Sequence, residues 1–190
     1  MHVESALAIA YANGADMRVI TDILDELADL SQDWKDKNRK ATAIIEESIR
    51  LKEEHFGPED PSIAKSLQVL SDIAWAAGRY CEAIQLLCRG LELQEKGLGT
   101  YHADVARSLE LLAAAYSSLE DFATAARFYE RALEVNIRVF GDDQRETTFS
   151  LSALAEAYRK IGRHEEAEEL ERRVEENWRR ERELESRQDK

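Results

Sequence analysis

The fold is decided by residues 78–99, a stretch that reads GRYCEAIQLLCRGLELQEKGLG. Its pattern returns at residues 120–141 and once more after that, so that Gly57, Gly99 and Gly141 lie 42 residues apart. Each of these glycines follows a large apolar residue. A fixed period of about 20–50 residues is typical of stacked repeat arrays. The sequence therefore predicts a repeat scaffold before any single residue is interpreted.

Residues 60–101 form the clearest repeat and predict a helical hairpin. Asp60 suits an N-cap, and Pro61 suits the first helical position. Apolar residues then recur at intervals of three and four, as on one helix face: Ile63, Leu67, Leu70, Ile73 and Ala74. A second helix follows the turn at residues 78–80, with an expected inner face of Ala83, Ile84, Leu87, Leu91 and Leu98. Gly99 ends it, because a residue without Cβ accepts the left-handed conformation of a C-terminal cap.

The period divides the chain into an ambiguous start and a helical array. The predicted units are residues 18–59, 60–101, 102–143 and 144–178, with a charged capping helix that continues to residue 190. Their expected inner residues include Val105, Leu109, Leu112, Tyr116, Ala125, Tyr129, Leu133, Phe140, Leu151, Leu154, Tyr158, Leu170, Val174 and Trp178. Residues 1–17 are either an N-terminal capping helix or the remnant of a repeat. The predicted fold class is all-α, a right-handed α-solenoid of stacked helical hairpins.

Stacking explains the small residues of the repeat. A hairpin cannot bury its apolar face alone, so neighbouring hairpins are expected to cover it, at about 25 cal/mol per Å² removed from water. One slot, where two helices approach closely, holds alanine in three repeats: Ala83, Ala125 and Ala167. Gly90 occupies a helix interior, where glycine costs up to ~1 kcal/mol relative to alanine. Gly90→Ala is therefore expected to stabilise the fold.

Charge and composition exclude several partners. The chain has 39 acidic and 26 basic residues and a net charge of −13. Phosphate binding needs a basic face, and anionic membranes attract basic segments, so neither nucleic acid nor a membrane is an expected partner. No apolar run approaches the ~18 residues of a membrane span. The short apolar run near the start follows no basic residue, and two cysteines give no disulfide framework, so we expect a cytoplasmic location.

The residues that carry chemistry are few and scattered. Cys81 and Cys88 would lie ~10 Å apart on one helix, too far for a mutual disulfide. Two thiols alone make no zinc site, and the four histidines have no metal-binding spacing. The carboxylates follow solvated helix faces. We therefore predict no catalytic residue, no metal and no cofactor, and we do not expect an enzyme.

The repeat unit resembles the tetratricopeptide repeat, especially the 42-residue repeats of kinesin light chains. The resemblance rests on residues 78–83 with 89–95, on Arg131-Ala132-Leu133-Glu134, and on the linker at residues 56–61. HEAT and armadillo repeats are the alternatives, but the alanine slot and the Gly-Arg-Tyr turn favour the tetratricopeptide type. The resemblance implies that a partner peptide or helix binds in a concave groove lined by the first helix of each hairpin.

The family's groove positions can be carried over one by one. They fall on Asp22, Asp25, Asp29, Lys65, Gln68, Asp72, Trp75, Arg107, Glu110, Ser117, Phe149, Ser152 and Arg159. The asparagines that recur in the family's grooves are replaced here by Gln68, Glu110 and Ser152. These residues are the candidate partner-binding site.

Two features of this groove suggest specificity. Its N-terminal end carries Asp22, Asp25, Glu26, Asp29 and Asp33 with no intervening base, which indicates either a docking site for a basic peptide or a solvated helix face. Further along, the counterparts of Trp75 in the next repeats are serine and arginine, so the fold does not require an indole there. Trp75 is either a hot spot for a bound peptide or a ring half-packed against a neighbouring helix.

Two functions fit these observations. The first is a protein–protein interaction scaffold that binds a peptide or helix of a partner in the groove. The alternative is a structural unit that forms homo-oligomers through its terminal repeats. The charged helix over residues 165–190 disfavours stacking at that end, whereas the Ala-rich start leaves the other end open.

Overall fold

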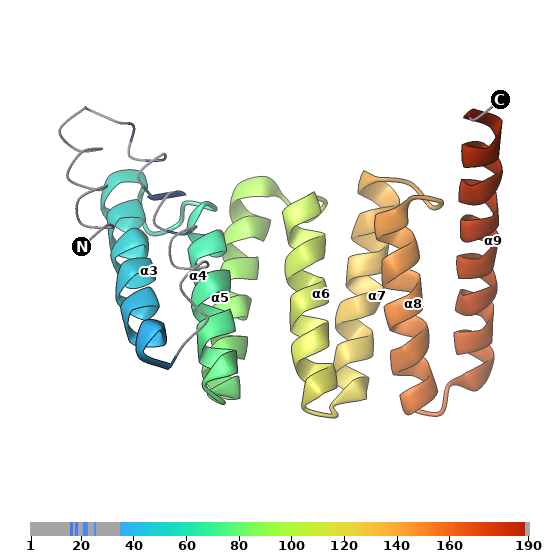
Figure 1. Cartoon of the computed structure of the whole chain (residues 1–190), viewed down its shortest axis with the longest axis horizontal. Coiled ribbons are helices and arrows are strands. Elements are labelled where there is room, and N and C mark those ends of the chain that lie inside the picture. Colours follow the sequence, from blue (N-terminus) through green and yellow to red (C-terminus); the bar gives the residue numbers. More distant parts are fainter. Residues whose placement is uncertain (1–15, 17, 19–20, 23–24, 26–34, 189–190) are drawn as a thin grey trace. The chain divides into compact units, whose positions relative to one another are not determined.

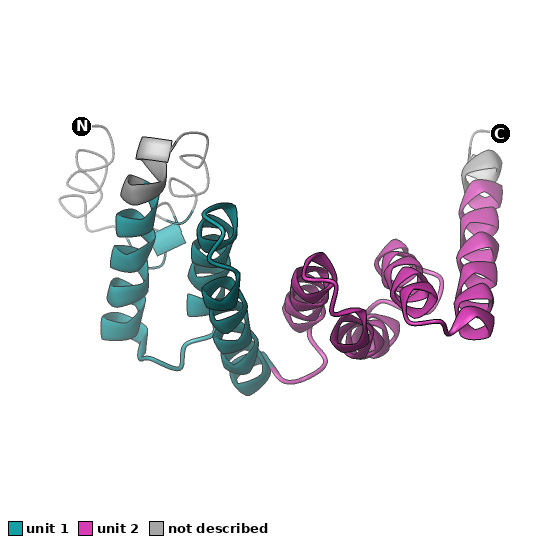
Figure 2. Ribbon diagram, turned by 90° about the horizontal axis from the view of Figure 1, so that it is seen from below, with its two compact units in different colours: residues 1–98 teal, residues 99–190 magenta. Residues whose placement is uncertain are grey.

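The computed structural model describes residues 16, 18, 21–22, 25 and 35–188, and every regular element in this part is a helix (Figure 1). The helices are α3 (Lys35–Phe56), α4 (Ile63–Ala76), α5 (Tyr80–Leu98), α6 (Ala103–Ser118), α7 (Phe122–Val139), α8 (Arg145–Lys160) and α9 (His164–Gln188). They belong to two compact units, residues 1–98 and 99–190 (Figure 2). None of the described helices is both long enough and apolar enough to cross a membrane. The segment predicted at residues 1–17 lies outside the described part, except for Asp16.

The first unit stacks one helical hairpin on a preceding helix. Helices α4 and α5 form the hairpin of residues 60–101, and α3 packs against α4. Between α3 and α4 lies a small core of Ala41, Ile45, Val69 and Ile73. A second cluster joins α4 to α5 through Ile63, Leu67 and Leu93. The apolar residues that recur at three- and four-residue spacing on α4 thus pack against both α3 and α5.

The second unit contains two stacked hairpins. Helices α6 and α7 form one, α8 and α9 form the other, and α7 packs against α8 (Figure 1). One continuous core runs through the stack, with members such as Tyr129, Leu133, Leu151, Leu154 and Leu170. The predicted apolar stripes therefore meet across the hairpins as well as within them, and the all-α repeat fold is confirmed.

The glycines that recur every 42 residues have the backbone conformation that the sequence predicted. Gly57, Gly99 and Gly141 have φ values of +93°, +84° and +108°, in the left-handed region that penalises a Cβ. The alanine slot is also confirmed, because Ala83, Ala125 and Ala167 are fully buried. The glycines end the second helices, and the alanines allow each second helix to approach a neighbouring helix closely.

Three details of the predicted hairpins are wrong. Helix α4 begins at Ile63 rather than at Pro61, because Asp60 to Ser62 form a turn in which the Ser62 N–H donates to Asp60 Oδ1 over 2.9 Å. Leu98 and Phe140, expected in the core, are exposed. Each stands at the C-terminal end of a second helix that is longer than the first helix of its hairpin, so no neighbouring turn covers it.

The apolar stripe of the charged C-terminal helix also differs from the prediction. Leu170 and Val174 are buried, but Trp178 is 51% exposed. Asn177 takes the next inner position and is buried, because its Nδ2 donates to Asp142 O over 2.9 Å and to Thr148 Oγ1 over 3.0 Å. The inner face of α9 thus becomes polar at Asn177.

The two glycines inside α5 give a matched test of helix packing. A Cβ added at Gly90 would meet Ala64 at 3.6 Å, an ordinary van der Waals contact, whereas one added at Gly97 would lie 2.8 Å from Pro61 Cγ. We expect Gly90→Ala to raise the free energy of unfolding by up to ~1 kcal/mol, because alanine favours the helix. Gly97→Ala should be clearly less stable than Gly90→Ala in urea unfolding. Equal stability of the two variants would contradict this packing.

Candidate functional site

The described part of the second unit contains a pocket of about 500 Å³. It is lined by α6, by the C-terminal end of α7 and by α8, through Ala103, Asp104, Arg107, Glu110, Asn136, Phe140, Arg145, Glu146 and Phe149. Arg107, Glu110 and Phe149 were predicted as groove residues of two successive repeats, and the structure brings all three to one pocket. They come from the first helices of the two stacked hairpins.

The pocket has an aromatic wall that is open to solvent. The Phe149 side chain is 61% exposed, although it belongs to a helix whose other face is buried in the core. Phe140, which the sequence placed in the core, lines the same pocket. Aromatic side chains, phenylalanine among them, are enriched at protein interfaces. The pocket thus presents two aromatic side chains to solvent.

Glu110 is the half-buried acid of this pocket. Its Oε1 accepts hydrogen bonds from Ser150 Oγ over 2.5 Å and from Asn136 Nδ2 over 3.0 Å. Burial raises the pKa of the Glu110 carboxyl group above its ordinary value, against the opposing effects of these two bonds and of the Arg107 charge. Glu146, which also lines the pocket, adds to the rise in this pKa. Glu110 thus carries a charge that its surroundings stabilise poorly.

The other predicted groove residues of the second unit lie outside this pocket. Ser117 is half-buried and hydrogen-bonded to Tyr129 of α7. Ser152 is half-buried as well. The Arg159 guanidinium pairs with Glu171 of α9 over 2.6 Å, so its charge is already compensated within the hairpin. These three positions belong to the first helices, as predicted, but they take no part in the concavity.

In the first unit, the predicted groove residues follow α4. Lys65 and Asp72 are exposed, and Gln68 and Trp75 are half-buried. The Trp75 ring lies 4.6 Å from the Tyr80 ring, centroid to centroid, at the turn into α5. The indole is therefore partly engaged within its own hairpin and partly open to solvent, which leaves its role as a hot spot a prediction.

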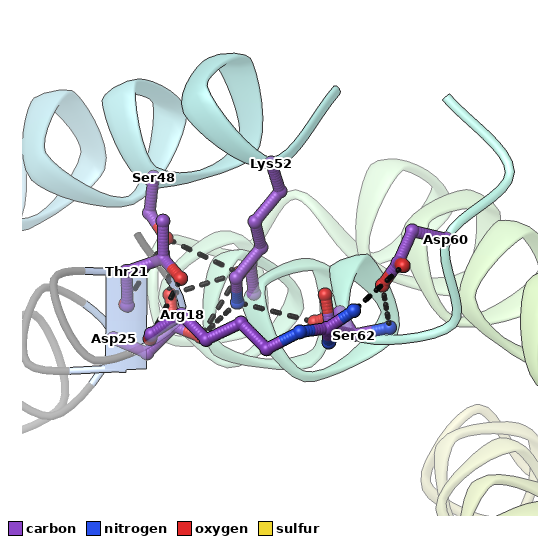
Figure 3. Close-up of polar contacts among 8 residues, drawn as sticks. Arg18, Thr21, Asp25, Ser48, Lys52, Asp60 and Ser62 are labelled. Carbon is purple, nitrogen blue, oxygen red and sulfur yellow. Dashed lines mark hydrogen bonds and ion pairs between the residues drawn. The ribbon is translucent and has the colours of Figure 1, made fainter. Parts of the chain in front are cut away.

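The predicted acidic docking end is wrong at Asp25. The Asp25 carboxylate is buried, with only 1% of the residue exposed, and cannot face a partner. Figure 3 shows it beside Ser48 and Lys52 of α3. Asp22 is exposed, and Asp29 lies outside the described residues. The physical reason for the error is that the compensating base comes from a different helix and was invisible in the local sequence.

Lys52 supplies that base. Its Nζ donates to Asp25 Oδ2 over 2.6 Å, to Ser66 Oγ over 2.8 Å and to Ser62 O over 3.1 Å (Figure 3). Ser48 Oγ donates to Asp25 Oδ1 over 2.7 Å. The pair is fully buried, so both ions depend on this network rather than on water. One signal in the sequence pointed to it: Lys52 shares its register with Gln94 and Asn136, two positions on the inner side of a second helix.

The described residues offer little for redox or metal chemistry. No cluster of three or more His, Cys, Asp or Glu side chains that would hold a metal ion occurs among them. Cys81 and Cys88 are both free, the first exposed and the second half-buried. Burial, helped by the charge of Glu92, raises the pKa of the Cys88 thiol, which disfavours its reactive thiolate.

Comparison with family models identifies the repeat. Residues 89–137 and 104–180 match the tetratricopeptide repeat model. No curated protein sequence matches the chain. The residues that match include the entire second unit up to the last turns of α9, and thus the whole pocket.

Solved structures show the same fold. BtubC (BKLC) from P. vanneervenii superposes with a TM-score of 0.82 at 22% identity, over 95% of this chain and 72% of that one. A candidate kinesin light chain of Podosopora anserina with nearly identical TPR-like repeats has a TM-score of 0.71 at 24% identity, over 93% and 83%. MamA has a TM-score of 0.64 at 16% identity, over 95% and 89%. At these identities the likenesses establish the fold, an all-α solenoid of helical hairpins.

The buried ion pair predicts a large effect of a single substitution. Lys52→Met would leave Asp25 buried without its cation, which typically costs about 3–5 kcal/mol of unfolding free energy. Lys96→Met is the matched control, because Lys96 pairs with Glu59 on the surface, where a pair contributes about 1 kcal/mol or less. Urea unfolding of both variants measures the difference. A Lys52→Met variant as stable as Lys96→Met would contradict the buried network.

The raised pKa of Glu110 predicts a pH dependence of stability. The folded state holds the Glu110 proton more tightly than the unfolded state, so this carboxyl group favours folding at low pH and loses that contribution as pH rises through its folded pKa. Glu110→Gln removes this titration. The unfolding free energy of the variant minus that of the wild type should therefore increase from about pH 4 to pH 7. A difference that is constant or decreases over this range would contradict the assignment.

Proposed function

Because this chain is a tetratricopeptide repeat protein, we propose that it is a protein–protein interaction module. Repeats of this family generally mediate protein–protein interaction or assembly. In this chain the first helices of the hairpins would bind a peptide or a helix of a partner protein. The pocket lined by α6, α7 and α8 is its main anchoring point.

One observation carries the proposal: Phe149 is a large apolar side chain, 61% exposed, at the edge of a concavity. Scattered exposed apolar residues are common, but one that borders a pocket together with a second exposed phenylalanine and several charged groups marks an interaction site. The fold does not need an aromatic at position 149, because the corresponding position in α6 is Arg107. Recognition of a partner explains Phe149 better than packing does.

The remaining groove positions of each unit would add contacts within that unit. On α6 and α8 these are Ser117, Ser152 and Arg159, and on α4 they are Lys65, Gln68, Asp72 and Trp75. Asp25 is not among them, because it is buried in its pair with Lys52. A basic partner segment at the N-terminal end would therefore have to rely on Asp22 and on other surface acids.

The proposed module acts by binding alone. We propose no catalytic step, no cofactor and no metal. The net charge of −13 favours a protein partner over nucleic acid or an anionic membrane. We also propose a cytoplasmic location, on the ground of the composition.

A displayed library of random 12-residue peptides, selected on the immobilised chain, provides the test. We expect the selected peptides to lose roughly 30-fold or more in affinity for Phe149→Ala, the loss typical of a binding hot spot. Trp178→Ala is the matched control, because Trp178 is a similarly exposed aromatic that does not line the pocket. Thermal melts of both variants check that the fold is unchanged.

The contrary results are distinct. If no selected peptide distinguishes Phe149→Ala from Trp178→Ala, the pocket is not the binding site. If sedimentation across a concentration range shows that the chain self-associates and that Phe149→Ala abolishes this association, the site serves homo-oligomers instead. That result would favour the structural assembly role over binding of a foreign peptide.

A further inference from the structure

The two units contain the same polar joint in two chemical forms. In the first unit, Lys52 lies on α3, the second helix of its repeat, and donates to the carboxylate of Asp25 in the same repeat. It also donates to the hydroxyl of Ser66 in α4, the first helix of the next hairpin. In the second unit, Asn136 lies two 42-residue periods after Lys52 and bonds to Glu110 and Ser150. The nitrogen donor and the serine therefore occupy equivalent positions in the two joints, whereas the acids, Asp25 and Glu110, lie one residue off that register. The donor is an ammonium group in one joint and an amide in the other.

Four hydrogen bonds correspond between the two joints. Lys52 Nζ also donates to the carbonyl of Ser62, and Asn136 Nδ2 donates to the equivalent carbonyl of Glu146 over 3.4 Å. The serine hydroxyl in each joint donates to the acid, over 2.8 Å to Asp25 Oδ1 and over 2.5 Å to Glu110 Oε1. Ser48, which also donates to Asp25, has no counterpart in the second joint, where the equivalent residue is Ala132. The two nitrogen donors themselves differ by one positive charge.

The joint of Glu110 and Asn136 lacks this positive charge, and it is the joint that is open to solvent. The Asp25–Lys52 pair is sealed from water, whereas Glu110 lines the pocket. In the described part of the chain no ion pair joins Glu110 to a basic side chain. Arg107 acts on it only through its field, and Arg145 is paired with Glu181 over 3.4 Å. Asp104 and Glu146 add two further carboxylates to the lining, so acids outnumber bases there by three to two.

We propose that this pocket accepts a lysine or arginine side chain of the bound partner. Its cationic group supplies at Glu110 the positive charge that Lys52 supplies at Asp25, from the pocket side and beside Asn136. Phe140 and Phe149 suit the rest of such a side chain, because aromatic rings attract cations and cover the aliphatic stem. An acidic or apolar partner group would instead desolvate the half-buried Glu110 carboxylate further and leave it without a counter-charge. The inference rests on the proposed function, since it names the chemistry recognised at the same pocket.

The same random peptide library tests this inference separately from the function. Among peptides whose binding depends on Phe149, we expect lysine or arginine at one fixed position. Replacing that residue by citrulline or norleucine should weaken binding at least tenfold. Glu110→Gln should weaken it to the same extent, and added salt should reduce the difference. Glu156→Gln is the matched control, because Glu156 is an exposed acid of α8 that does not line the pocket.

A second variant supplies the missing cation from within. Asn136→Lys places an ammonium group at the position equivalent to Lys52, where it should neutralise Glu110 and abolish binding of the basic peptides. Peptides that depend on Phe149 but carry no fixed base, or that bind Glu110→Gln as well as wild type, would overturn the inference and leave the proposed function intact. If no peptide depends on Phe149, both fail.

Discussion

Stacking one hairpin on the next buries polar side chains along with apolar ones, and each buried polar atom then needs a partner. In this protein a serine of each first helix lies at the stack, and Ser66, Ser108 and Ser150 are all buried. Ser66 and Ser150 each belong to a hydrogen-bonded joint with two further groups. One is an acid, and the other is a nitrogen donor on a neighbouring second helix. The joint fixes the register of the stack, because a slip of one residue would leave a charge or an amide unsatisfied.

The candidate site follows from this constraint. Where the joint contains its own cation, the polar network is closed and serves stability alone. Where the joint contains an asparagine, the acid has no basic partner within the joint. This acid, Glu110, lines a pocket between α6, α7 and α8 that also contains aromatic residues. Residues that recur in every repeat serve the stack, so a position that departs from them is free to serve another role. We propose that Glu110 and Asn136, with Phe149 in the same pocket, are such positions and give this chain its specificity.

Sequence patterns predicted the fold well where they report on the backbone and on apolar periodicity. The glycine joints, the alanine slot and the inner faces of α4, α6 and α8 needed only local spacing. The pattern failed at the ends of helices, because burial there depends on the length of the neighbouring helix. Leu98 and Phe140 stand at such ends and are exposed. Trp178 lies well inside α9 and is exposed because Asn177 takes the inner position there.

The 42-residue period and the three- and four-residue spacing of apolar residues determined by themselves that the chain is an all-α repeat protein. Together they also placed Arg107, Glu110 and Phe149 on first helices. Only the tertiary structure decided which acids are open to a partner. Asp25 and Glu110 look alike in the sequence, since both are acids on a first helix. One meets Lys52 across the stack and the other meets Asn136. The reason is that charge compensation depends on distance in space, and the residue that meets the acid lies 27 residues away along the chain in one joint and 26 in the other.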